Sequence, residues 1–208
     1  GLPGGITFVQ FLAPGLLASA CVQSASFEAA WPVMGKLVWY GNYKAMVCTP
    51  LDAGDLVLGE LAWIGLRAAM IATVFMTVMI GFGVVPHLSP IVVLAIPAAA
   101  VTGLAFSASI LPLAAVLKQS HSFNVVFRFG VTPLFLFSGV FFPVSQLPSG
   151  FRWVALVSPL YHGVELTRAF VLEQRVPPGA AVHLAYLCGL VAAGTATARM
   201  TFRRKLHA

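Results

Sequence analysis

Apolar runs of about 20 residues or more follow one another along this chain, and they limit its fold more than any other feature. They lie at about residues 6–30, 61–85, 91–117, 123–142 and 181–200. A helix of roughly 20 mostly apolar residues crosses the hydrocarbon core of a bilayer and satisfies its own backbone hydrogen bonds there. The pattern therefore predicts an all-α polytopic membrane protein, with five transmembrane helices in a single transmembrane domain over residues 1–208.

Composition excludes the other broad classes. The chain is 59% hydrophobic and 9% charged, with a mean hydropathy of +0.93, whereas soluble domains carry about 25% charged residues. Disordered chains are far less apolar, and a soluble domain of 208 residues has too little interior for this much hydrocarbon. The net charge of +6 does not indicate nucleic-acid binding, because the charges lie at the ends of apolar runs instead of forming a basic patch.

Residues that often build metal or catalytic sites are dispersed. Cys21, Cys48 and Cys188 show no CxxC or Cys/His spacing. The histidines have neither the i, i+4 spacing nor the carboxylate partner typical of metal and acid–base sites; they are His87, His121, His162, His183 and His207. No GxxxxGK[ST] phosphate-binding loop is present. We therefore predict no metal, no cofactor, no catalytic residue and no ATPase activity within this chain.

A polar stretch, residues 41–60, lies between the first two apolar runs. Its charged residues are Lys44, Asp52, Asp55 and Glu60, with Lys36 just upstream. Pro50 and Gly54 predict a short helix that breaks and restarts before the second span. An apolar patch of Met46, Val47 and Leu51 with a charged rim is typical of a protein interface, whereas the alternative is an ordinary solvated loop. We expect this stretch to meet a partner in water.

Three charged residues, of which Glu60 is also part of the polar stretch, lie within or beside predicted spans. Glu28 is expected to end the first span, close to the polar stretch. Glu60 and Arg67 are seven residues apart and therefore share a helix face. They could pair with each other, or each could snorkel to water at the membrane boundary.

The segment 145–179 contains two apolar runs, 151–157 and 159–172, that are too short to span and are punctuated by prolines. Polar residues recur there at intervals of three and four, which predicts amphipathic half-helices at the external membrane interface. His162, Glu165 and Arg168 form a polar cluster, which either satisfies half-helix ends or contacts a substrate.

An aromatic set lies near the end of the fourth predicted span: Phe135, Phe137, Phe141 and Phe142. These rings could line a path for an amphipathic cargo. Their spacing is also that of core or lipid-facing residues in a helix.

Basic residues predict the orientation. Placing the 31–59 loop, the 118–122 loop and the C-terminus on one side collects Lys36, Lys44, Lys118, Arg128, Arg199, Arg203, Arg204 and Lys205 there, against Arg152, Arg168 and Arg175 on the other. The positive-inside rule makes the first side, with the C-terminus, cytoplasmic. Gly1 then lies outside, without an initiator Met or a visible signal peptide, so we expect that the sequence lacks a first helix.

Five blocks resemble one known family, in order along nearly the whole chain. They are FLAPGLLASA (11–20), ASFEAAW (25–31), YKAMVCTPLDAGDLVLGEL (43–61), TPLFLFSGVFFPVSQLP (132–148) and SPLYHGVELTRAFVL (158–172). The chain resembles the permease, or membrane subunit, of type-2 ABC transporters, and within them the nodulation-factor (NodJ-like) and daunorubicin-resistance exporters.

This resemblance implies six transmembrane helices per subunit and two permease subunits, either a homodimer or a pair with a related permease. It also implies separate ABC ATPase subunits that bind ATP and Mg on the cytoplasmic side. The family's coupling helix, which seats in a groove of the ATPase, would lie in residues 31–60. The family's amphipathic helix and first span have no counterpart here.

The residues and the resemblance together predict the permease of an ATP-driven exporter in the plasma membrane. Its cargo would be an amphipathic drug, a lipid or a lipid-linked saccharide, which includes antibiotic efflux. The alternatives are an ion-coupled secondary carrier, which usually needs ionisable residues deep in its spans, and a membrane enzyme acting on a lipid-linked substrate.

Overall fold

A computed structural model describes residues 7–87, 89–117, 119, 121–146 and 149–206, and every regular element in these residues is helical. The first half contains α1 (Phe8–Met34), its π-helical continuation η1 (Gly35–Trp39), α2 (Asn42–Met46), α3 (Ala53–Gly81), η2 (Pro90–Leu94) and α4 (Ala95–Val116). The second half contains α5 (Ser122–Val126), η3 (Phe127–Val131), α6 (Thr132–Phe137), η4 (Val144–Gln146), α7 (Ser149–Val157), α8 (Pro159–Arg168), η5 (Ala169–Glu173) and α9 (Ala180–Leu206).

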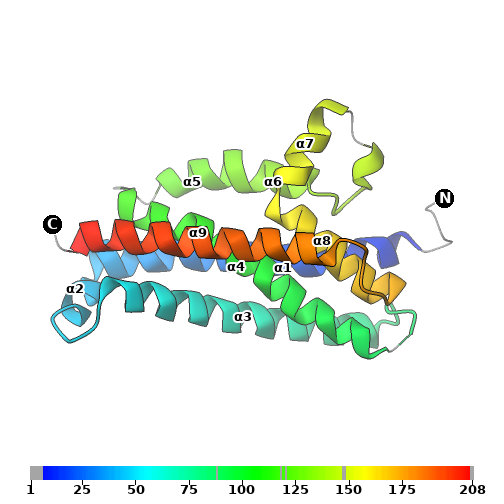
Figure 1. Ribbon diagram of the computed structural model, residues 1–208, viewed down its shortest axis with the longest axis horizontal. Helices are drawn as coiled ribbons and strands as arrows, with labels where there is room; N and C mark the ends of the chain where they lie inside the picture. The colour runs from blue at the N-terminus through cyan, green and yellow to red at the C-terminus, as the bar shows by residue number, and fades with distance from the viewer. Residues whose placement is uncertain (1–6, 88, 118, 120, 147–148, 207–208) are drawn as a thin grey trace.

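Among the described residues, four helices are long and apolar enough to cross a membrane: Phe8–Trp39, Ala53–Gly81, Pro90–Val116 and Ala180–Leu206. They lie side by side in Figure 1, with a shorter apolar helix, Ser122–Phe137, beside them. This arrangement confirms the predicted all-α polytopic membrane fold. The predicted half-helices are also present, as α7 and as α8 with its extension η5.

Several helices differ in their bounds from the prediction; α3 begins at Ala53 instead of near residue 61, and α9 ends at Leu206 instead of near residue 200. The first helix continues to Trp39 instead of ending near residue 30, because the apolar run after Pro32 keeps a helical backbone through η1. The fourth apolar helix ends at Phe137, short of residue 142. The chain turns at Gly139, whose φ of 83° is left-handed, and a Cβ there would lie 2.8 Å from the Val144 side chain.

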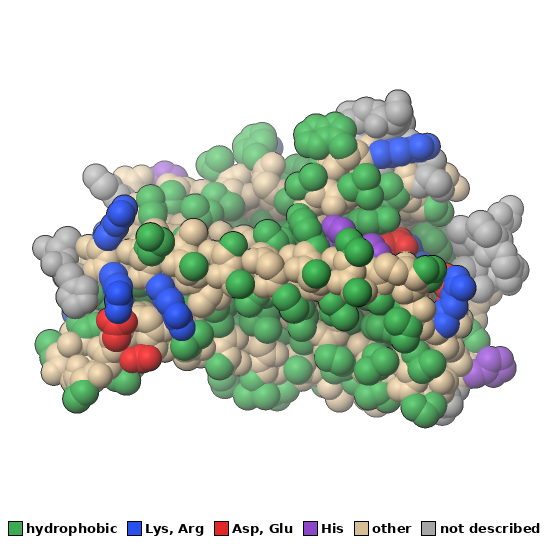
Figure 2. Space-filling view, in the orientation of Figure 1, with side chains coloured by type: hydrophobic (Ala, Val, Ile, Leu, Met, Phe, Trp, Pro, Cys, Tyr) green, Lys and Arg blue, Asp and Glu red, His purple; other side chains and the backbone are tan. Residues whose placement is uncertain are grey.

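The bundle has two distinct ends. One carries α2, the start of α3 and the C-terminal end of α9; we call it the α2 end (Figure 1). The opposite end carries α8 and the turn between α3 and α4. In Figure 2 hydrophobic side chains spread over the length of the visible face, whereas Lys, Arg, Asp and Glu gather toward its ends. This distribution matches a bilayer across the middle of the bundle.

Helix α4 is the packing centre, and it contacts α1, α3, α8 and α9. Small residues allow the backbones to approach closely. A Cβ at Gly194 of α9 would lie 2.4 Å from the Ala108 carbonyl oxygen, and one at Gly163 of α8 would lie 2.2 Å from Thr102 Oγ1. Such contacts are the usual source of helix association in lipid, where burial of apolar surface supplies little driving force.

This packing predicts opposite effects for two glycines of α9. Gly194→Ala inserts a methyl group into the α4 backbone and should lower stability by about 1–3 kcal/mol through overpacking. Gly189→Ala meets open space and should leave stability unchanged or raise it by up to about 1 kcal/mol, because Ala favours helix. Thermal unfolding of both variants in the same detergent measures the difference, and equal melting temperatures would contradict it.

Candidate functional site

The polar stretch folds as the predicted broken and restarted helix. Gly41, with a left-handed φ of 66°, separates the first helix from α2, and a turn follows α2 before α3 begins. A reciprocal capping box starts α3. The Asp52 carboxylate accepts from the Gly54 amide at 3.2 Å, and the Asp55 carboxylate accepts from the Asp52 amide at 2.9 Å.

Tyr43 anchors α2 to the spans. Its side chain is buried, and its hydroxyl donates to Glu60 Oε1 of α3 at 2.5 Å. Lys36 Nζ of η1 lies 2.5 Å from the same oxygen. Burial and the Glu60 carboxylate raise the pKa of Tyr43, so the phenol remains a neutral donor. A single carboxylate therefore links the end of the first helix, the short helix and the start of α3.

The end of α9 makes a second link to this stretch. Arg203 Nη2 lies 2.8 Å from Asp52 Oδ2, and the rings of Phe202 and Tyr43 lie 6.0 Å apart. The Arg203 guanidinium and the Gly54 amide hold the pKa of Asp52 below its usual value. Residues 41–60 are therefore linked to the end of the first helix, to α3 and to α9.

Two of the seven predicted interface residues face inward. Val47 packs against the core, and the Glu60 side chain is only 12% exposed. Asp52 is engaged in the cap and in the Arg203 ion pair. The exposed members of the predicted set are Lys44, Met46, Leu51 and Asp55.

The exposed apolar surface also extends upstream to residues that the sequence analysis missed. Tyr40 is 73% exposed and Trp39 is 56% exposed, at the end of η1. We call Trp39, Tyr40, Met46 and Leu51 the coupling patch. The signal was present in the sequence as the apolar run ending in LVWY, just before Gly41.

Of the two alternatives for Glu60 and Arg67, pairing with each other is wrong, because each residue has a partner on the first helix. Glu60 pairs with Lys36, and Arg67 pairs with Glu28. The Glu28–Arg67 pair forms because α1 packs against α3, and the Lys36–Glu60 pair forms because the first helix continues beyond residue 30 through η1. Glu28 accordingly lies inside α1 and does not end it.

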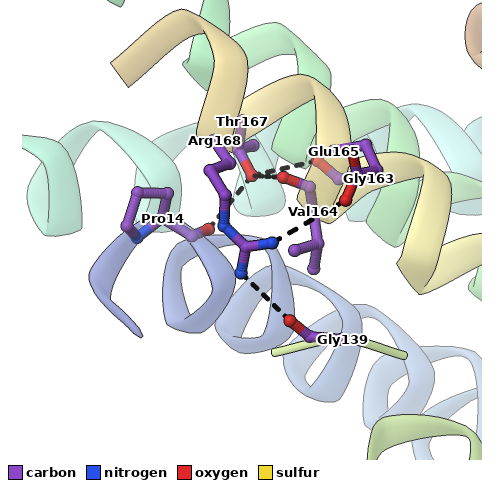
Figure 3. A network of polar contacts seen from close by, with 7 residues as sticks. All are labelled: Pro14, Gly139, Gly163, Val164, Glu165, Thr167 and Arg168. Carbon is purple, nitrogen blue, oxygen red and sulfur yellow. Dashed lines mark hydrogen bonds and ion pairs between the residues drawn. The ribbon is translucent and has the colours of Figure 1, made fainter. Parts of the chain in front are cut away.

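At the opposite end, Arg168 and Thr167 fasten α8 to two other segments (Figure 3). The Arg168 guanidinium lies 4.0 Å from the centre of the Phe11 ring, and its Nη2 donates to the Gly139 carbonyl at 3.0 Å. Its Nη1 lies 3.7 Å from Glu165 Oε1. The Thr167 hydroxyl lies 3.1 Å from the Pro14 carbonyl. Glu165 and Arg168 therefore belong to a connection between α1, α8 and the turn after α6.

His162, the third residue of the predicted polar cluster, turns to α9. Its Nδ1 lies 2.7 Å from His183 Nδ1. Burial, followed by the charge of His183, lowers the pKa of His162, although the Leu156 carbonyl acts in the opposite direction. The histidines are 21 positions apart, so no spacing rule in the sequence pairs them.

The four phenylalanines that were predicted to line a cargo path do not form one group. Phe135 packs edge-on against Phe141 with ring centres 5.2 Å apart, and Phe137 and Phe142 are half-buried. Phe135 also lines a groove of about 420 Å³ between α1 and the α5–α6 helix, together with Gln23, Phe27, Trp31, Phe127, Val131 and Thr132. Only one predicted residue therefore reaches this aromatic groove.

Within the described parts of the chain, no group of three or more His, Cys, Asp or Glu side chains is arranged to hold a metal ion.

The geometry combines a membrane bundle, a short helix with exposed apolar residues, and half-helices at the far end. The sequence model described as ABC-2 type transporter matches residues 4–172. The chain belongs to the ABC-2 type transporter family.

Curated relatives of this permease carry the name Nodulation protein J. The protein of Sinorhizobium fredii is 35% identical over 90% of this chain and 71% of its own length. The protein of Rhizobium leguminosarum bv. viciae is 31% identical over 99% of this chain and 78% of its own length. The protein of Bradyrhizobium diazoefficiens is 32% identical over 97% of this chain and 76% of its own length. Membership of the family makes the chain the membrane subunit of an ABC exporter, and it implies an ABC ATPase partner.

The shared carboxylate gives a stability prediction. Glu60→Ala leaves the buried Tyr43 hydroxyl and the Lys36 ammonium without their acceptor, which should cost about 1–3 kcal/mol. Glu173→Ala removes an ion pair with Arg175 whose side chains are 47% and 64% exposed, and such pairs contribute only about 0–1 kcal/mol. Thermal unfolding of the purified permease compares them, and an equal or larger loss for Glu173→Ala would refute the anchoring role of Glu60.

Proposed function

We propose that this permease moves an amphipathic drug, a lipid or a lipid-linked saccharide out of the cell, driven by a separate ATPase. The observation that carries the proposal is the placement of α2. It joins two spanning helices, exposes the coupling patch, and is anchored from behind by Tyr43 and Glu60. The coupling patch is apolar, has the exposed charges of Lys44 and Asp55 nearby, and is attached to spanning helices. These properties suit binding of a partner that pushes on the membrane domain.

The coupling mechanism follows from these contacts. The ATPase, which binds ATP and Mg, docks on the coupling patch and moves as it closes. The Tyr43–Glu60–Lys36 link transmits this displacement to the first helix and to α3, and the Asp52–Arg203 pair transmits it to α9. The bundle then opens a path along the aromatic groove toward α7 and α8, between this subunit and a second permease that is either identical or related.

The α2 end is cytoplasmic in this proposal, in the plasma membrane, with the C-terminus on the same side. Support comes from the positive-inside rule. The described basic residues of α2, η1 and the end of α9 are Lys36, Lys44, Arg199, Arg203, Arg204 and Lys205, whereas the segment containing α7, α8 and η5 has Arg152, Arg168 and Arg175. Lys118, which was counted with the first group, lies outside the described residues.

Ion-coupled transport is the second candidate, and one observation favours it. The Glu28–Arg67 pair lies inside α1 and α3, where ionisable residues often serve ion pathways. The opposite charges already neutralise each other, so the carboxylate is satisfied without an exchangeable ion. The pair therefore does not require ion coupling, and the placement of α2 favours the ATP-driven proposal.

The coupling patch gives a binding prediction. The double variant Met46→Ala, Leu51→Ala should weaken ATPase binding about tenfold or more, because truncating a hot-spot residue at the centre of an interface costs about 2 kcal/mol or more. Both side chains are exposed, so insertion and stability should not change. Co-purification with the ATPase measures the effect.

Val176→Ala serves as the control, since Val176 is equally apolar and exposed but lies near the start of α9, at the opposite end. Undiminished co-purification of the double variant would remove the patch from the ATPase interface. Charge reversal at Asp55 is a poorer test, because it would also break the capping box at the start of α3.

Transport itself separates the two candidates. Efflux of an amphipathic dye from cells that express the permease with its ATPase should be abolished by vanadate and by loss of the ATPase. A protonophore should leave efflux unchanged while ATP is maintained. Efflux that survives vanadate but stops with the protonophore would favour the ion-coupled carrier.

A further inference from the structure

Side chains from α8 and α9 hold the C-terminal end of half-helix α7. The last carbonyls of an α-helix have no partner within the helix. The Tyr186 hydroxyl of α9 donates to the Val157 carbonyl at 2.5 Å, and His162 Nε2 of α8 lies 2.9 Å from the Leu156 carbonyl. The rings of His162 and Tyr186 lie 4.2 Å apart, centre to centre. Two aromatic side chains therefore close one helix end.

The contact between His162 and His183 fixes where the protons lie. A carbonyl only accepts, so His162 Nε2 must carry the proton that it donates to Leu156. The Nδ1 of a neutral His162 is then an acceptor. His183 Nδ1, 2.7 Å away, must donate to it. In this arrangement both neutral rings are satisfied.

The pair accommodates one additional proton but not two. His183 Nε2 takes no part in the contact, and it can bind a proton while Nδ1 continues to donate. A second proton has to bind at His162 Nδ1. Two N–H groups would then point at each other across 2.7 Å, and two positive rings would lie side by side. This state forces the two imidazoles apart and disturbs the His162 and Tyr186 side chains that hold the end of α7.

The surrounding charges do not cancel this effect. Charged neighbours on α8 are Glu165 and Arg168, and η5 with the turn after it adds Glu173 and Arg175; all four line a polar cavity of about 210 Å³ together with His183. They form two internal pairs of opposite sign. Tyr161 and Tyr186 contact the imidazoles as neutral rings, and α7 contributes the exposed Arg152. The cavity gives His183 access to water.

We infer that the His162–His183 pair is a proton-sensitive link, which holds α7 against α8 and α9 until both imidazoles are charged and then releases it. The link is a regulatory device beyond the export activity, and it does not depend on which molecule is exported. Because the closed state disfavours the charged His162, closure is fully favoured above the ordinary histidine value of about pH 6.5 and weakens as the pH falls below it. Acid at the α7–α8 end therefore frees the half-helix.

Amide hydrogen exchange of the permease in lipid nanodiscs tests the link. Between about pH 8 and about pH 5, exchange of residues 152–157, corrected for its intrinsic pH dependence, should accelerate about tenfold or more, which corresponds to about one pK unit of coupling between the rings. Helix α4 should show no such change. In His183→Phe, which retains a ring but cannot charge, the acceleration should disappear.

Tyr186→Phe is the matched control, because it removes the bond to Val157 and leaves both imidazoles in place. It should raise exchange of α7 at every pH and keep the acid-induced acceleration. Pure end-capping by these residues would instead make His183→Phe and Tyr186→Phe behave alike, and that result overturns the inference.

A second measurement uses the wild-type chain alone. Selective ¹⁵N-histidine spectra should show the pair taking up protons in two separate steps, with the second step accompanying the opening of α7. Independent titration of the two rings, or no change in α7 exchange down to about pH 5, would also overturn the inference. These readouts require neither cargo nor ATPase, so their failure leaves the proposed export function untouched.

Discussion

Direct contact between helix backbones is the constraint on which this bundle depends. In lipid, apolar side chains gain little by leaving one hydrocarbon environment for another, so association relies on van der Waals contact and on polar groups that must find partners. Helix α4 supplies the first through the sites where Gly194 and Gly163 approach it. Because α4 contacts α1, α3, α8 and α9, a displacement of any one of these helices changes the packing of the others through α4.

The polar connections are concentrated toward the ends of this rigid centre. At the α2 end, Glu60 joins Lys36 and Tyr43, and Asp52 joins Arg203. At the opposite end, Arg168 joins α8 to Phe11 and to Gly139. The permease thus has a stiff apolar middle with a separate set of directional contacts at each end. Such an arrangement allows a force applied at one end to reach the other through helices instead of loops.

Sequence reasoning predicted the features that have a local cause. Apolar run length predicted the helices, and Pro50 and Gly54 predicted that the helix breaks and restarts before the second span. It failed where the outcome depended on a distant segment. The extension of the first helix to Trp39 brings Lys36 to Glu60, and the packing of α1 against α3 brings Glu28 to Arg67, so Glu60 and Arg67 each pair with the first helix.

The same distinction applies to the candidate sites. Met46 and Leu51 were identified correctly as exposed, but the inward position of Val47 follows from the anchoring of Tyr43, which depends on Glu60 and on α9. The partner of His162 lies on a helix that begins after the half-helix segment, and the reach of Arg168 to Gly139 depends on the turn after α6. Tertiary contacts of this kind leave no periodic signature in a sequence.

Three π-helical turns in the described residues have a mechanical consequence. They follow α1, interrupt the α5–α6 helix and follow α8, at Gly35–Trp39, Phe127–Val131 and Ala169–Glu173. A π turn holds about one residue more than an α turn. Converting one to α geometry rotates everything beyond it by about 100° and lengthens the helix by about 1.5 Å, without unwinding it. In η1, such a conversion would rotate Trp39 and Tyr40 of the coupling patch about the helix axis.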